Sequence, residues 1–127
     1  MTIGELINEL KKCKPDSKVY YDFAGLMPTT INSWRGTYDE PALGWAGLKY
    51  LCNWGLDNPP TVENLLKELD LALQLSYTGW KGGVYFYTED SPLHIDNYGE
   101  WTCTELSRVE NTGSSVILHT IRYDVFN

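Results

Sequence analysis

Hydrophobic residues recur at helical spacing in two separate stretches of the chain. The apolar positions are Ile3, Leu6, Ile7 and Leu10 in the first stretch, and Val62, Leu65, Leu66, Leu69 and Leu73 in the second. Thr2 and Glu5 have the spacing of a capping box, and Pro15 ends the first stretch. The second stretch begins at Thr61, directly after two prolines. This pattern predicts two amphipathic helices.

Strand-like patterns occupy much of the remaining chain. Val19, Tyr21 and Phe23 alternate with polar or half-polar neighbours, as one face of a strand does. The predicted strands cover residues 18–23, 83–88, 92–96, 102–109 and 115–124. The last two flank the turn sequence NTGS, in which glycine permits positive φ, so they should form a hairpin.

Segment 24–60 shows little periodicity. It holds five of the eleven glycines, four of the six prolines and three of the five tryptophans. Long irregular segments in compact domains usually carry function, so we expect a long, ordered, aromatic-rich loop. The fold class predicted is therefore α+β: a mostly antiparallel sheet with two amphipathic helices and this loop, in one domain over residues 1–127.

Charge and cysteine content narrow the classes of function. The net charge of −7 disfavours bulk nucleic acid and anionic membranes as partners, although one local basic pocket could still hold a small anion. The three cysteines are far apart and form no C-x-x-C pair, which predicts a reducing cytoplasm and no metal site. The opening MTIGELINELKK is amphipathic, unlike a signal peptide, and the longest apolar runs are too short to cross a bilayer.

The stretch SWRGTY is the first candidate binding site. Arg35 offers a planar group that matches phosphate or carboxylate, and Gly36 lets a ligand approach the backbone closely. Trp34 and Tyr38 are rings that can stack on a base, and Ser33 begins the motif. The alternative is an ion pair of Arg35 with a neighbouring carboxylate, in which case the glycine only makes a turn.

A second candidate site is GWKGGVY. Gly82 and Gly83 expose backbone N–H groups beside Lys81, as in an anion-binding nest, and Trp80 adds a ring. The alternative here is again that the glycines only form turns.

The stretch HIDNYGEW contains a third set of candidate ligand contacts. Asp96 and Asn97 could recognise the donor and acceptor edges of a base, and Tyr98 could stack on it. The alternative is an Asx-type turn ahead of Gly99.

Catalytic motifs do not emerge from the sequence. His94 and His119 both fall on predicted strands, and neither begins the His-x-Ser/Thr motif of two-histidine phosphoesterases. No zinc-protease, nucleophile-elbow, P-loop or dinucleotide-binding pattern occurs. We therefore predict a protein that is not an enzyme, with no catalytic residue, cofactor or metal.

Several of these motifs, taken together, resemble a family of small bacteriophage proteins. The shared pattern runs from Thr2 to about Gly99: T-[IV]-x-E-L, KVYYDF, P-T-x-I-x-S-[WY]-R-G-x-Y-x-x-x-A-L, G-[WY]-K-G-G and NYG. Small phage proteins of this kind often counter bacterial immunity. The resemblance implies a role in the cytoplasm of the bacterial host, where one such class, the sponges, binds nucleotide second messengers and withholds them from the effector. The expected ligand is a cyclic nucleotide or an ADP-ribose derivative.

Two other functions remain open. An acidic surface can mimic nucleic acid and inhibit a host defence enzyme by occupying its basic groove. The chain could also be an accessory fold without a ligand, its aromatic residues serving the core and oligomer contacts.

Oligomerisation is a separate expectation. Trp34, Trp45 and Trp54 crowd a segment with little room to bury them, which favours a homo-oligomer, most simply a twofold dimer with segment 34–54 at or near its interface. Alternatively, these rings cover the sheet within one chain.

Overall fold

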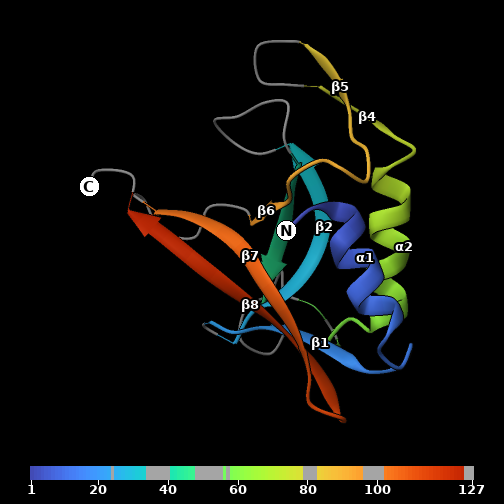
Figure 1. Cartoon of the computed structure of the whole chain (residues 1–127), viewed down its shortest axis with the longest axis vertical. Coiled ribbons are helices and arrows are strands. Elements are labelled where there is room, and N and C mark those ends of the chain that lie inside the picture. Colours follow the sequence, from blue (N-terminus) through green and yellow to red (C-terminus); the bar gives the residue numbers. More distant parts are fainter. Residues whose placement is uncertain are drawn as a thin grey trace.

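Two helices lie side by side against one face of a curved sheet in the computed structural model of the chain (Figure 1). The structure describes residues 1–23, 25–33, 41–47, 56, 58–78, 83–95 and 102–124, with the side chains of 32, 33, 77, 78, 85, 102–104 and 122–124 excepted. The elements are α1 (Ile3–Lys11), β1 (Lys18–Tyr21), β2 (Met27–Ser33), β3 (Pro41–Ala46), α2 (Val62–Ala72), β4 (Ser76–Thr78), β5 (Val84–Phe86), β6 (His94–Ile95), β7 (Thr102–Asn111) and β8 (Ser115–Asp124).

The main sheet has six strands in the order β1-β8-β7-β6-β3-β2. Its β2–β3, β6–β7 and β7–β8 pairs are antiparallel, whereas the β1–β8 and β3–β6 pairs are parallel. Strands β4 and β5 form a separate two-stranded antiparallel sheet. The α+β class with a mostly antiparallel sheet and two helices is confirmed.

Curvature brings distant strands of the main sheet together. The Tyr21 hydroxyl on β1 donates a buried hydrogen bond to the Gly44 carbonyl on β3, at 2.8 Å. Three strands separate β1 from β3 in the sheet order, so this bond requires the sheet to curl. The backbone N–H of Tyr21 also donates to the Leu26 carbonyl, just before β2. The two ends of the sheet therefore approach each other.

Both helices begin with a capping box. Thr2 and Glu5 form it on α1, as the spacing predicts, and Thr61 and Asn64 form it on α2. Because the Thr2 N–H and hydroxyl group hydrogen-bond to the Glu5 carboxylate, the pKa of Glu5 lies below its usual value. No helix in the described ranges is long and apolar enough to cross a membrane.

The hydrophobic core lies between the helix pair and the sheet. Its fully buried large side chains are Ile3, Leu6, Leu10, Val19, Met27, Leu43, Val62, Leu65, Leu69, Leu93, Ile95 and Leu118. The predicted apolar faces of both helices supply half of this set, so the helical spacing identified the core-facing positions correctly.

The β7–β8 hairpin agrees with its prediction in position and turn. Gly113, in the NTGS turn, has φ of +92°, a conformation that glycine adopts without steric cost. Three other predicted strands are shorter in the structure. The strand predicted at 18–23 corresponds to β1, and those predicted at 83–88 and 92–96 correspond to β5 and β6.

The prediction of one long loop over 24–60 is wrong, because β2 and β3 lie within it. Strand β3 is buried at nearly every position, so no apolar–polar alternation marks it. It also begins with Pro41 and contains Gly44, both unusual within strands. An irregularity between Pro28 and Ile31 interrupts β2 as well. The remaining parts of the aromatic-rich segment lie outside the described residues.

Candidate functional site

The first motif connects β2 to β3. Ser33 is the last residue of β2, and its backbone pairs with that of Pro41 at the start of β3. The antiparallel pair therefore carries the S-W-R-G stretch at the end of a hairpin. Trp34, Arg35, Gly36 and Tyr38 themselves lie outside the described residues.

The second motif connects β4 to β5. Thr78 pairs with Val84, so residues 79–83 close this two-stranded hairpin. Gly83 precedes β5 and is exposed, whereas Trp80, Lys81 and Gly82 lie outside the described residues.

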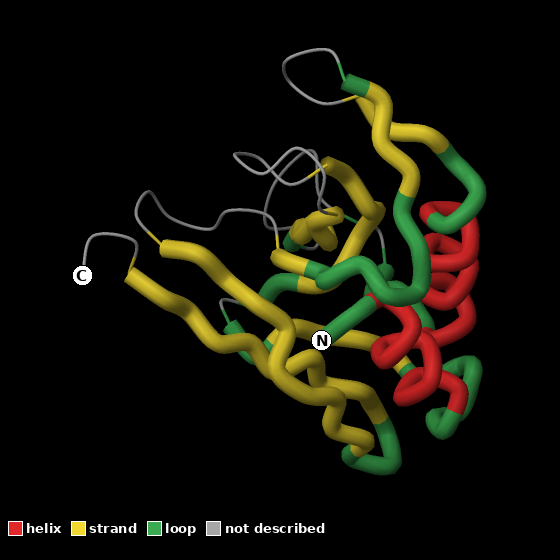
Figure 2. Tube along the Cα trace, turned by 45° about the horizontal axis from the view of Figure 1, so that its top comes forward, coloured by secondary structure: helices red, strands yellow, loops and turns green. Residues whose placement is uncertain are grey.

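The two hairpins extend toward the same end of the molecule, beyond the ends of the helices (Figures 1 and 2). The strands that carry the Arg35 and Lys81 motifs are thus directed to one region, although the main sheet contains the first hairpin and not the second. The tertiary fold supplies this convergence, which sequence spacing does not reveal.

The third motif leaves the sheet elsewhere. Asp96, Asn97 and Tyr98 follow β6 and lie outside the described residues. Because β6 runs parallel to β3, the chain leaves β6 in the direction of the C-terminal end of β3. Residues 34–40 instead join the N-terminal end of β3. The strand directions do not bring this third stretch to the β2–β3 hairpin.

Each histidine lies in the sheet. His94 belongs to β6 and is half-buried. His119 on β8 has its Nε2 atom 2.7 Å from a Glu110 carboxylate oxygen and its Nδ1 atom 3.6 Å from Asp22. The Thr120 hydroxyl donates to Asp22 at 2.7 Å, rather than to the imidazole. These contacts join the end of β1 to β7 and β8.

The described ranges contain no candidate metal site. No group of three or more His, Cys, Asp or Glu side chains there could hold a metal ion. Cys13 is a free, partly buried thiol whose Sγ lies 3.6 Å from the Glu9 carbonyl. Burial, together with the Glu9 carboxylate, raises the pKa of Cys13, which makes it a weaker nucleophile.

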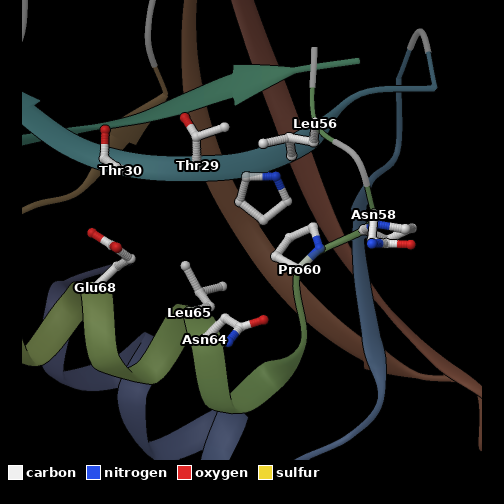
Figure 3. A pocket seen from close by; sticks show the side chains of 10 residues that line it. Thr29, Thr30, Leu56, Asn58, Pro60, Asn64, Leu65 and Glu68 are labelled. Carbon is white, nitrogen blue, oxygen red and sulfur yellow. The ribbon is translucent and has the colours of Figure 1, made fainter. Parts of the chain in front are cut away.

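A pocket that the sequence analysis missed lies between β2 and α2 (Figure 3). Its volume is about 420 Å³. The lining residues are Pro28, Thr29, Thr30, Leu56, Asn58, Pro59, Pro60, Asn64, Leu65 and Glu68. No local motif in the sequence marks this pocket. One wall is β2, which lies in the segment without periodicity, and the other is α2, whose pattern predicts only a helix that packs on the core.

The chain matches no protein-family model, no curated protein and no solved structure.

Proposed function

We propose that this protein binds a nucleotide second messenger, of the cyclic-nucleotide or ADP-ribose type, and withholds it from its effector without cleaving it. The observation that supports the proposal is the common direction of the β2–β3 and β4–β5 hairpins, whose connections contain Arg35 and Lys81 (Figure 1). A chain with net charge −7 needs local cations to hold an anion, and each of these two connections contains one. The resemblance to phage proteins supports a counter-defence role in the bacterial cytoplasm.

The same residues suit sequestration better than turnover. Cations hold phosphates, tryptophan and tyrosine rings stack on bases, and neighbouring glycines let the ligand reach backbone N–H groups. Tight binding needs no nucleophile or acid–base pair. Ligand recovered from the protein should therefore be chemically unchanged.

Arg35→Ala should weaken binding by about tenfold or more, because it removes a charge-assisted contact to phosphate. Purified protein is screened by thermal shift against cyclic dinucleotides, cyclic oligonucleotides and ADP-ribose derivatives, and hits are titrated by calorimetry. A ligand at 100 times its Kd adds about 2.7 kcal/mol of stability, which is easily detected.

Lys67→Ala is the matched control for charge, because Lys67 is exposed on α2 and pairs only loosely with Glu63 at 3.4 Å. It should bind like the wild type. Chromatography of ligand released by heating checks turnover. A hydrolysed or linearised product would make the protein an enzyme, and a wild type that binds none of the panel would favour the acidic-inhibitor alternative.

We also propose a twofold homodimer with segment 34–54 at or near the interface. Val84 and Phe86 on β5 support it: they are 61% and 71% exposed, on the hairpin that extends in the same direction as β2–β3. Neighbouring strand β4 has no charged residue, so a second acidic copy could pack there without like-charge repulsion. Trp45 contributes less than expected, because it is half-buried and packs on the core of its own chain.

Light scattering at micromolar concentration should therefore give twice the 14.5 kDa chain mass. Phe86→Ser should shift the distribution toward the single chain, since it removes the most exposed apolar ring among the residues that the structure describes. A species of 14.5 kDa for the wild type, with and without ligand, would contradict the dimer.

A further inference from the structure

The pocket between β2 and α2 is built from two kinds of surface. Its inner wall is apolar: Pro28 and Leu65 are buried, and Leu56 and Pro60 are half-buried beside them. Saturated rings and a leucine offer a surface on which a planar ring packs by dispersion. At about 420 Å³ the space lies within the range of pockets that hold small organic ligands.

The polar groups of the pocket gather around its rim. In Figure 3, Thr29 and Thr30 lie on β2 and Glu68 extends from α2 toward that strand, while the Asn64 side chain lies along the helix near its N-terminal end. The Asn64 side-chain oxygen accepts the Thr61 N–H at 3.0 Å, which leaves its NH₂ group to donate. Asn58 adds another amide at the side of the pocket. The rim therefore offers both donors and acceptors.

Glu68 decides the charge of the site. It is half-buried, and within the described part of the chain its carboxylate has no hydrogen-bond or ion-pair partner. No lysine or arginine lines the pocket among the described residues. A phosphate would meet an uncompensated negative charge there, whereas an uncharged ligand that donates N–H or O–H groups would meet an acceptor.

We infer that this pocket binds the nucleoside part of the ligand, with the base against the prolines and Glu68 accepting from base N–H or ribose hydroxyl groups. The inference rests on the proposed function, because it assigns the uncharged half of the same nucleotide. Strand β2 links the two regions: Thr30 of the pocket lies about 10 Å, at the usual rise, from Ser33 at the end of the strand, and the Arg35 motif follows. One strand thus joins the nucleoside pocket to the connection that contains Arg35.

The test uses nucleosides that lack phosphate. Adenosine, guanosine, cytidine, uridine and free ribose are titrated into the full-length protein to about 10 mM, enough to detect millimolar Kd values. At least one nucleoside should bind. Glu68→Gln should raise the Kd of that nucleoside by about tenfold or more, as expected for loss of a charged acceptor. Glu63→Gln is the matched control, since Glu63 lies on α2 but does not line this pocket.

Arg35→Ala separates this inference from the proposed function. This variant should bind nucleosides as the wild type does, but it should bind the phosphorylated ligand more weakly. If the nucleotide binds in an Arg35-dependent way but no nucleoside binds, the pocket assignment is overturned and the proposed function stands. Equal losses for Glu68→Gln and Glu63→Gln, or ribose binding as tightly as every nucleoside, would also overturn it. Melting temperatures of the unliganded variants verify that both glutamines leave the fold intact.

Discussion

Leu69→Ala should lower the free energy of unfolding by about 3 to 5 kcal/mol, the upper part of the range for a leucine removed from a packed core. Leu69 lies on the buried face of α2, is 0% exposed and belongs to the core cluster shared by both helices and the sheet. Truncation removes apolar burial and leaves a cavity between elements that cannot all move to fill it. Urea or guanidinium denaturation, followed by circular dichroism, measures the change.

Leu71→Ala is the matched control on the same helix. Leu71 is 46% exposed, so the same truncation there should cost well under 1 kcal/mol, because alanine also has the higher helix propensity. Equal losses for the two variants would show that α2 does not pack on the sheet through the Leu69 face.

Gly44→Ala should destabilise the protein by about 1 to 3 kcal/mol, as other insertions into packed sites do. A Cβ atom at this position of β3 would collide with the Thr29 hydroxyl on β2 and approach the Thr30 carbonyl to 3.3 Å. The Gly44 carbonyl also accepts the Tyr21 hydrogen bond that closes the curled sheet, so β3 has little freedom to shift. Thermal and chemical denaturation both report the loss.

Two variants control this prediction. Gly47→Ala should cost little, because the nearest atom to a Cβ there is Leu26 Cδ2 at 3.9 Å, an ordinary contact. Thr29→Ala removes the colliding hydroxyl and should recover part of the stability in the Gly44→Ala background, a coupling that a double-mutant cycle measures. Strict additivity of the two substitutions would argue against the contact.

Thr29 also connects the stability of this region with the proposed site. Its side chain packs beside Gly44, and the residue belongs to the wall of the pocket that contains Glu68. Because glycine at 44 leaves room for the Thr29 hydroxyl, the same close approach of β2 and β3 shapes the rim of the pocket. Gly44→Ala should thus weaken nucleoside binding as well as stability.

The sequence predicted which residue types could bind a ligand, but not how the segments that contain them are arranged in space. Arginine or lysine between glycine and an aromatic ring defined the motifs at Arg35 and Lys81, whereas the common direction of their hairpins depends on how β4–β5 packs beyond the main sheet. No local sequence pattern marks Glu68, because its role depends on which strand lies opposite it.

The sequence by itself determined the elements that local interactions stabilise. The capping box at Thr2, the helix start at Thr61 after two prolines and the apolar spacing define α1 and α2, and the glycine turn at Gly113 defines the β7–β8 hairpin. Each depends on contacts between residues close in the chain, so a local pattern carries the information.

Only the tertiary structure decided that β2 and β3 are strands and that β1 pairs with β8 and β3 with β6. Parallel partners are joined by long connections, and a strand buried on both faces loses its alternation, so neither leaves a local signature. The pocket exists for the same reason: β2 and α2 become its two walls only when burial of Leu65 and Leu69 packs the helix against the sheet.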